Sequence, residues 1–256
     1  MSLAPSGARH LLCAAVLLIA LATGRAAAAA ETMVFAAASL ADALTEIGRA
    51  YEASSGHHVV FNFGATSDLG RQIRAGAPAD VFFSADRAQM DAVEQAGLVR
   101  AADRRDVLSN ALVVVVPART PRRIQSPSDI AAFDRLALAD PQAVPAGVYA
   151  RRYLESIGLW ARLRDRIVPT LNVRAALSAV ESENVPAAVV YRTDAAVSSR
   201  VRVAFEVPRE AGPPIVYVLA PLAAASPAAR LFADELVSAR AAAVYRKYGF
   251  IVLPPR

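Results

Sequence analysis

The most constraining feature of this 256-residue chain is the stretch 33–44, where a short buried strand runs directly into a helix. The apolar run at 33–35 predicts the strand, and beyond Ser39 the apolar residues adopt the spacing of one helix face. Ser39 is predicted to cap this helix, and Asp42, three residues later, nearly completes a capping box. A helix N-terminus presents free N–H groups and the positive end of the helix dipole. The junction therefore suits an anion, unless Ser39 serves only as a cap.

Three further junctions repeat this construction. Thr66 follows a predicted strand at 59–63 and opens a helix, and Asn172 is predicted to cap another helix. At 145–147 small residues open a helix, so a ligand can approach their backbone N–H groups closely. None of the four turns itself carries Arg or Lys. This pattern indicates an anion held by hydroxyls and backbone amides rather than by salt bridges.

Strands alternate with helices along the rest of the chain, which predicts an α/β fold with mostly parallel sheets. Ligands of such folds bind at the carboxyl ends of strands, where the helices begin. The predicted strands lie at 33–35, 59–63, 81–84, 112–116, 136–139, 187–191, 201–205 and 215–219.

The composition excludes several classes of function. The 28 basic and 23 acidic residues give a small positive excess, and the arginine pairs lack interleaved aromatic residues, so we expect no nucleic-acid partner. The sequence contains no G-x-S-x-G, G-x-x-x-x-G-K-S/T, G-x-G-x-x-G or H-E-x-x-H motif. No histidine lies in a context that indicates a general base, and His57 and His58 fit a solvated turn. We therefore expect no catalytic residues and no enzymatic activity.

The first thirty residues have the pattern of a cleaved secretory signal peptide. Arg9 and His10 precede an apolar run at 11–23 that is too short to span a bilayer comfortably, and the alanines at 26–30 offer cleavage sites. Cys13, the only cysteine, lies early in that run, where lipid attachment is not expected. The mature chain should then begin within 27–32 and contain no disulfide.

Four segments occur in order over nearly the whole mature chain. They are Val34-Phe35-Ala36-Ala37-Ala38-Ser39-Leu40, Ala75-Gly76-Ala77-Pro78-Ala79-Asp80-Val81-Phe82, Asp140-Pro141 with Val144-Pro145-Ala146-Gly147-Val148-Tyr149-Ala150, and Tyr245-Arg246-Lys247-Tyr248-Gly249-Phe250. Together they resemble the periplasmic molybdate-binding proteins of bacterial ABC transporters. The resemblance implies a two-lobed type II periplasmic binding protein. Its sheets would be mixed, mostly parallel and flanked by helices, with a ligand cleft between the lobes.

On this resemblance, residues 31–110 and 217–256 form lobe 1 and residues 111–216 form lobe 2, with hinge crossings near 109–110 and 214–216. The protein is expected to be a periplasmic monomer that captures molybdate, or tungstate, and delivers it to the membrane permease of an ABC transporter. We expect no cofactor, and molybdenum is expected only as the bound molybdate oxyanion. The alternative ligand is sulfate or another small oxyanion.

The resemblance also implies five hydrogen-bond donors to the oxyanion. Ser39 and Thr66 would supply hydroxyls from lobe 1. Lobe 2 would supply the backbone amides of Ala146 and Val173 and the hydroxyl of Tyr191. A remote alternative is an exported α/β hydrolase with Ser39 as nucleophile, which would need a base within hydrogen-bond reach.

Three residues depart from the family pattern. Thr66 stands where serine is usual, so its methyl group is expected to tighten or tilt the pocket. Asp68 stands where threonine is common. Because a carboxylate aimed at the anion would repel it, we expect Asp68 to cap its helix and face away. Asn172 replaces a residue that is often acidic, which we expect to be harmless.

Overall fold

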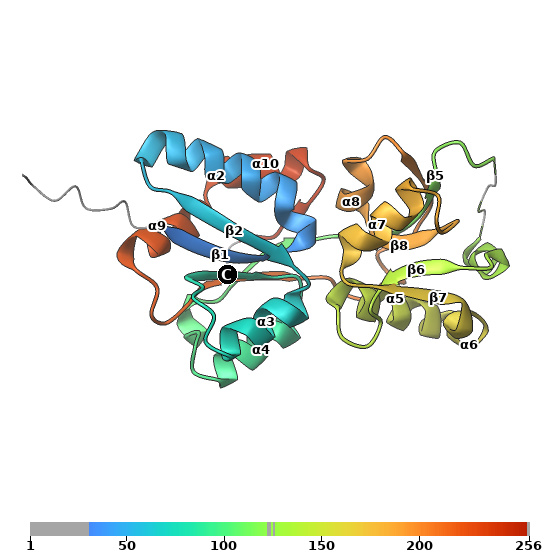
Figure 1. Cartoon of the computed structure of the whole chain (residues 1–256), viewed down its shortest axis with the longest axis horizontal. Helices are drawn as coiled ribbons and strands as arrows, with labels where there is room; N and C mark the ends of the chain where they lie inside the picture. The colour runs from blue at the N-terminus through green and yellow to red at the C-terminus, as the bar shows by residue number, and fades with distance from the viewer. Residues whose placement is uncertain (1–30, 122–123, 125, 255–256) are drawn as a thin grey trace, which may run out of the picture. The chain divides into compact units, whose positions relative to one another are not determined.

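The computed structural model describes residues 31–121, 124 and 126–254, which form two β-sheets with helices on their faces (Figure 1). The predicted signal peptide at 1–30, including Cys13, lies outside the described residues. The alternation of strands and helices confirms the predicted α/β class. None of the described helices combines the length and the apolar character that crossing a bilayer requires.

The first sheet combines strands from both ends of the described chain. In spatial order its strands are β11 (Ile251–Val252), β4 (Arg105–Ser109), β10 (Tyr217–Pro221), β3 (Val81–Ser84), β1 (Thr32–Ala37) and β2 (Val59–Gly64). β1 pairs in parallel with β2 and β3. β10, β4 and β11 are added antiparallel, so the two ends of the chain meet in one sheet.

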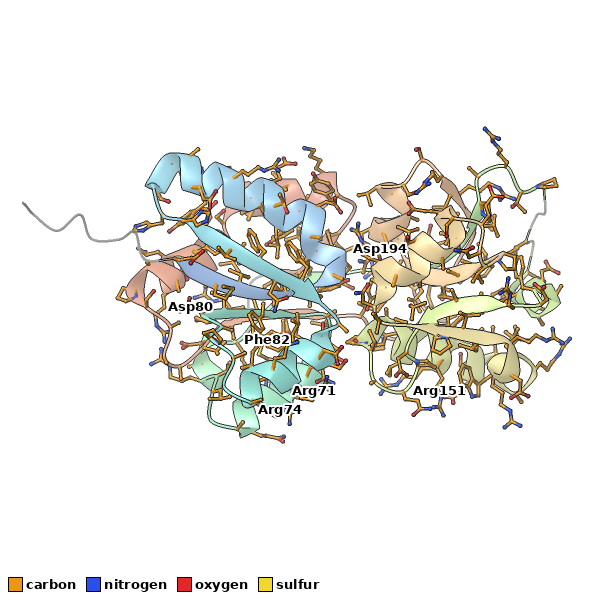
Figure 2. All side chains as sticks on the ribbon, in the orientation of Figure 1. Arg71, Arg74, Asp80, Phe82, Arg151 and Asp194 are labelled. Carbon is orange, nitrogen blue, oxygen red and sulfur yellow. The ribbon has the colours of Figure 1, made fainter. Side chains whose placement is uncertain are left out.

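Side-chain alternation along the strands divides the core of the first sheet between two helical layers. Val34 and Phe83 pack into one apolar cluster, and their neighbours Phe35 and Phe82 (Figure 2) pack into the other. Because both faces are covered, the strands are apolar at consecutive positions. The Phe82 layer contains α3 (Thr66–Arg74) and α4 (Arg87–Gln95), and the Phe83 layer contains α2 (Ala41–Ser55), α9 (Pro227–Glu235) and α10 (Ala239–Lys247) (Figure 1).

The second sheet uses only residues from the middle of the chain. In spatial order its strands are β7 (Ile167–Thr170), β6 (Leu136–Ala139), β8 (Ala188–Tyr191), β5 (Leu112–Pro117) and β9 (Val201–Glu206). Figure 1 shows α7 (Val173–Glu181) and α8 (Arg192–Ala196) over one face and α5 (Pro145–Ser156) and α6 (Trp160–Leu163) over the other. The run of buried valines at 113–116 on β5 follows from this double covering.

Short 3-10 helices join several of these elements. They are η1 (Ala38–Leu40), η2 (Ala101–Asp103), η3 (Pro127–Ala132) and η4 (Arg164–Arg166). Of these, η1 matters most for the site, because it connects β1 to α2 and contains Ser39.

The sheets are mixed, as predicted, but the prediction that they are mostly parallel is wrong. Among the described residues, four of the nine strand pairings are parallel and five are antiparallel. Most of the antiparallel pairings occur where the chain passes from one sheet to the other. β5 and β10 are the first strands after these passages, and each lies antiparallel to both of its neighbours. The sequence analysis also missed β4, β7 and β11, since β4 begins with two charged residues, β7 is an edge strand with Pro169, and β11 has two residues.

Candidate functional site

The five residues predicted to hold the ligand all line one small pocket. Small residues such as Ala38, Gly64 and Ala85 complete the walls, and none of the described residues that line the pocket is charged. The cavity measures about 10 Å³, close to the room that a single buried water needs. In this conformation the site is nearly closed, and small residues leave its backbone amides and hydroxyls facing one another.

Ser39 lies inside η1 and is not the helix cap that the sequence predicted. Ala37 is the N-cap of η1, α2 begins at Ala41, and neither of these two helices has a side-chain cap. Instead, Ser39 Oγ shares a hydrogen bond of 2.9 Å with the hydroxyl of Tyr217 on β10. The prediction failed because a 3-10 turn precedes α2, which gives Ser39 a helical backbone, whereas an N-cap residue needs a non-helical one.

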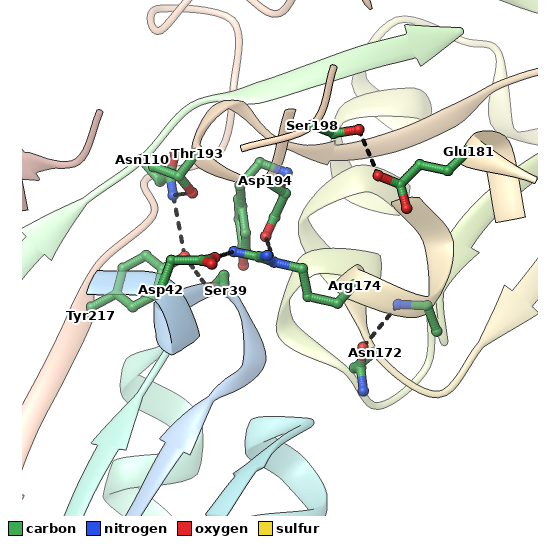
Figure 3. Close-up of polar contacts among 12 residues, drawn as sticks. Ser39, Asp42, Asn110, Asn172, Arg174, Glu181, Thr193, Asp194, Ser198 and Tyr217 are labelled. Atoms are coloured by element: carbon green, nitrogen blue, oxygen red, sulfur yellow. Dashed lines mark hydrogen bonds and ion pairs between the residues drawn. The ribbon is translucent and has the colours of Figure 1, made fainter. Parts of the chain in front are cut away.

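A buried network of polar groups continues from Tyr217 to Asn110 and Thr193 (Figure 3). Asn110 Nδ2 donates to Thr193 Oγ1 at 2.9 Å and to the Tyr217 hydroxyl at 3.3 Å. Each of these side chains, like Ser39, is buried. Burial raises the pKa of the Tyr217 hydroxyl far above its usual range, although the hydrogen bonds with Ser39 and Asn110 oppose this shift. Tyr217 therefore keeps its proton and can donate.

Thr66 is the first residue of α3, and its hydroxyl does not cap that helix, because Ala65 is the N-cap. Thr66 Oγ1 accepts a hydrogen bond from the backbone N–H of Ala85 at 3.2 Å. The hydroxyl is therefore held in place at the pocket wall by the turn that follows β3.

Asp68 does not cap α3 either, which corrects that part of the prediction. Its carboxylate pairs with Arg71 at 2.9 Å, and the side chain is 42% exposed. Asp68 is not among the residues that line the pocket. Its charge is therefore matched by an arginine at the surface rather than directed at the ligand.

Ala146 lies in the first turn of α5, where backbone N–H groups have no acceptor within the helix. Gly147 permits the helix to begin this close to the end of β6. A Cβ at Gly147 would lie 1.9 Å from the carbonyl oxygen of Ala139, which is an impossible contact. The small residues of this junction therefore bring free amides to the carboxyl end of a strand.

Val173 is the first residue of α7, so its amide also belongs to a first helical turn. Asn172 is the N-cap, as predicted, and its side-chain oxygen accepts from the N–H of Ala175 at 3.0 Å. The cap satisfies the amide of Ala175, so the amide of Val173, one of the orphan donors of the first turn, stays available to a ligand.

Tyr191 ends β8, and its hydroxyl has no hydrogen-bond partner within the described part of the chain. The side chain is 1% exposed, and burial raises the pKa of the hydroxyl well above its usual range, so it remains a donor. Buried donors in native proteins are almost always satisfied. An unpartnered phenol in a pocket wall therefore indicates an acceptor that a ligand supplies. The other unpartnered buried oxygen of the described residues, Ser67 Oγ, belongs to a residue that lines a separate cavity.

An ion-pair cluster beside the pocket was not predicted from the sequence (Figure 3). Arg174 donates through Nε to Asp194 and through a terminal nitrogen to Asp42, both at 2.6 Å. Asp42 belongs to α2 of the first sheet, and Arg174 and Asp194 belong to α7 and α8 of the second. Asp194 also accepts from the backbone N–H of Tyr191 at 3.2 Å. The cluster thus joins α2, which directly follows η1 and Ser39, to α7, which begins at Val173, and to the backbone of Tyr191.

Burial and charge act against each other in this cluster. Burial raises the pKa of the Asp194 carboxyl to about 6, although Arg174 and the N–H of Tyr191 lower it. Burial alone would lower the pKa of Arg174, but Asp194 and Asp42 outweigh it and hold that pKa above its ordinary value. The position of Arg174 beside Val173 was the only local signal, and no local pattern pairs Asp42 with a residue 132 positions away.

Known proteins share the sequence pattern and the fold of this chain. A sequence model described as "Bacterial extracellular solute-binding protein" matches residues 32–251. The chain is 36% identical over 250 residues to the protein named molybdate-binding protein ModA of Escherichia coli (strain K12), covering 95% of this chain and 97% of that one.

Two solved structures share the fold. The Azotobacter vinelandii periplasmic molybdate-binding protein has a TM-score of 0.76 at 22% identity, covering 87% of this chain and 99% of that one. The sulfate-binding protein SubI from Mycobacterium tuberculosis H37Rv also has a TM-score of 0.76, at 18% identity, covering 86% of each chain. At these identities the likeness shows the fold alone, and it is equally close for two different oxyanion binders.

Proposed function

The chain belongs to the bacterial extracellular solute-binding proteins, and from that premise we propose that it captures molybdate for the membrane permease of an ABC transporter. The identity with a relative named for molybdate binding supports molybdate as the ligand. The observation that carries the proposal is the Tyr191 hydroxyl, a buried donor without a partner in the described chain. It belongs to the same pocket as Ser39, Thr66, Ala146 and Val173.

The chemistry of the pocket selects for an anion that carries no proton. Each of the five proposed contacts can donate a hydrogen bond, and no carboxylate lines the pocket among the described residues. Molybdate, tungstate and sulfate, fully deprotonated dianions, can accept all of these bonds. The proton of hydrogen phosphate would meet no carboxylate acceptor, and a buried unsatisfied polar group costs about 1–3 kcal/mol. Sulfate must be excluded by size, because its shorter bonds leave some donors out of reach.

We further propose that residues 31–110 and 217–256 form lobe 1, that residues 111–216 form lobe 2, and that the lobes close on the ligand. In support, β4 of the first sheet is followed by β5 of the second, and β9 of the second by β10 of the first. The proposed hinge crossings, near 109–110 and 214–216, fall at the end of β4 and just before β10. Small-angle scattering should show compaction when molybdate is added. An unchanged scattering curve at saturation would count against closure.

Calorimetric titration with molybdate, tungstate, sulfate and phosphate tests the ligand. We expect molybdate and tungstate to bind tightly, sulfate more weakly and phosphate most weakly. Sulfate is the second candidate because a sulfate-binding protein shares the fold and sulfate passes the same hydrogen-bond test. Tighter binding of sulfate than of molybdate would transfer the proposal to sulfate, and phosphate binding as tight as molybdate binding would refute this account of the pocket.

The proposed route places the protein in the periplasm as a monomer after cleavage of residues 1–30. Membership of an extracellular family and the signal-like N-terminal sequence support export. Intact-mass measurement of the exported protein should show a chain that begins within 27–32. Retention of Cys13, especially with an added lipid mass, would contradict a cleaved, unanchored protein.

A role in binding, without catalysis, also fits the surroundings of Ser39. A hydrolase would need a base within hydrogen-bond reach of the nucleophile. The side-chain partner of Ser39 Oγ is the Tyr217 hydroxyl, and no histidine is among the described residues that line the pocket. Chromogenic ester substrates should therefore be left intact by the purified protein, and turnover abolished by Ser39→Ala would revive the hydrolase alternative.

A further inference from the structure

We propose that Tyr217 and Asn110 act as positioning residues that orient the Ser39 hydroxyl as a hydrogen-bond donor and thereby set which oxyanions the pocket accepts. The inference rests on the proposed oxyanion-binding function and deepens it. Neither Tyr217 nor Asn110 lines the pocket. Both would act through Ser39 rather than by touching the ligand.

The direction of the hydrogen bonds begins at Asn110. The backbone N–H of Ala111 can only donate, and it lies 2.9 Å from Asn110 Oδ1. This contact identifies the acceptor end of the Asn110 amide and leaves the amino group facing Thr193 and Tyr217. An amide NH₂ has no acceptor capacity, so the Tyr217 oxygen must accept at this contact.

The same reasoning determines the next bond. The Tyr217 oxygen accepts from Asn110, so the Tyr217 hydrogen is free to donate to Ser39 Oγ, 2.9 Å away. The reverse direction would leave the Tyr217 hydrogen facing a donor in a fully buried position, where unsatisfied polar groups are unfavourable. Ser39 Oγ therefore accepts from Tyr217, and its own hydrogen remains for the ligand.

The consequence is a serine that donates to the ligand by construction. A freely rotating hydroxyl can donate a hydrogen bond to an anion, or it can accept a hydrogen bond from an O–H group of the anion. With its rotation restricted by Tyr217, Ser39 favours an oxygen that carries no proton. This relay, the chain of hydrogen bonds from Asn110 through Tyr217 to Ser39, thus favours the binding of molybdate and sulfate over that of hydrogen phosphate.

Tyr217→Phe removes the hydroxyl and keeps the ring that packs against Tyr191 and Phe250. We expect the affinity for molybdate to fall about ten-fold, the effect of roughly one hydrogen bond. Sulfate should lose the same factor, because it is also unprotonated. The affinity for hydrogen phosphate should fall little or rise, because Ser39 can then rotate to accept a hydrogen bond from the O–H group of this anion. The preference for molybdate over hydrogen phosphate should therefore narrow by about the same ten-fold.

The experiment measures dissociation constants by competition calorimetry at about pH 8, where phosphate is chiefly the hydrogen phosphate dianion. Tyr245→Phe is the matched control, since Tyr245 is equally buried and its hydroxyl donates to the carbonyl of Leu236, away from the pocket. The control should lower thermal stability and leave the molybdate-to-phosphate preference unchanged.

A second variant, Asn110→Ala, keeps the test decisive if Tyr217→Phe folds poorly. It releases the Tyr217 hydroxyl without removing it, so it should narrow the same preference by a smaller factor. An equal loss for molybdate, sulfate and phosphate, or an unchanged preference, would overturn the relay while molybdate binding by the wild type upholds the proposed function. A wild type that binds none of these anions would refute the proposed function itself.

Discussion

The two sheets contribute differently prepared donors to the pocket. Ser39 and Thr66, from the first sheet, each have a hydrogen-bond partner within the protein, Tyr217 and the N–H of Ala85. Tyr191, from the second sheet, has no partner among the described residues, and the amides proposed with it lie in first helical turns. One side of the pocket is therefore preorganised, and the other presents donors that a ligand can satisfy.

This difference bears on how binding energy is used. A preorganised donor loses little freedom when the ligand arrives, so it favours affinity directly. An unsatisfied buried donor raises the free energy of the ligand-free protein, so it favours a rearrangement that supplies an acceptor. The donors on the first sheet would bind the anion first. Closure would then lower the free energy most on the side of the second sheet, where the unsatisfied donors gain an acceptor. Each prediction below tests or sharpens this comparison.

The largest expected effect concerns Arg174, which connects the two sides. Arg174→Leu leaves the fully buried Asp194 without its cation, and breaking a buried pair in this way costs about 3–5 kcal/mol of unfolding free energy. The loss should depend on pH. The folded pKa of Asp194, about 6, lies above its ordinary value, so this group favours folding most at low pH and less as pH rises through about 6.

Without Arg174 the pKa of Asp194 rises further, so the variant and the wild type should differ least near pH 5 and most near pH 8. Urea unfolding across this range measures the difference. Glu155→Gln, which removes an exposed ion pair with Arg151 (Figure 2), is the control and should show no such dependence. Arg174→Leu combined with Asp194→Asn should recover part of the loss at high pH. A destabilisation that does not depend on pH would contradict the view that Arg174 stabilises the fold by neutralising the Asp194 carboxylate.

Ser39→Ala tests the preorganised side. Removing one donor to a charged ligand should cost about 1.5–3 kcal/mol, or roughly ten-fold to a hundred-fold in the dissociation constant for molybdate. The ligand-free protein should also become less stable, because the buried hydrogen of Tyr217 loses its acceptor. Calorimetry and thermal unfolding measure the two effects. If this variant bound molybdate with wild-type affinity, the Ser39 hydroxyl would not be a ligand contact.

Tyr191→Phe tests the side of the pocket whose donors have no partner in the ligand-free protein. It should lower the affinity for molybdate and raise the stability of the ligand-free protein. Affinity for molybdate should fall about ten-fold. The ligand-free protein should become more stable by about 1 kcal/mol, because a buried hydroxyl without a partner is removed. If Tyr191→Phe instead lowered ligand-free stability as Ser39→Ala is expected to, the contrast between the two sides would fail.

Thr66→Ser should have the smallest effect. The hydroxyl remains, so the bond from the N–H of Ala85 and the donor to the ligand can both persist. We expect the dissociation constant for molybdate to change by less than about three-fold. Thr66→Val, which keeps the shape and removes the hydroxyl, is the matched comparison and should weaken binding clearly. Equal affinities for the serine and valine variants would exclude the hydroxyl as a ligand contact.

Local sequence was enough to predict the α/β class, most of the strands and the junctions at which the pocket lies. Hydrophobic spacing over a few residues specifies a strand or a helix start, and small or hydroxyl-bearing residues mark where the backbone amides are accessible. The cap at Asn172 was predicted for the same reason, since its acceptor and donor are three residues apart. The five proposed ligand residues came from the family resemblance, and the structure brings all five to one pocket.

Tertiary structure alone decided the direction of the strands and the partners of the polar side chains. Ser39 was predicted to cap its own helix, yet its partner is Tyr217, 178 positions away, and Asp42 meets Arg174 across 132 positions. Ser39 meets Tyr217 because the first sheet combines strands from both ends of the described chain. Asp42 meets Arg174 because α7 of the second sheet packs against η1, directly before α2. Local propensity describes only neighbours within a few residues, so it predicts where a hydroxyl emerges and not which distant group determines its orientation.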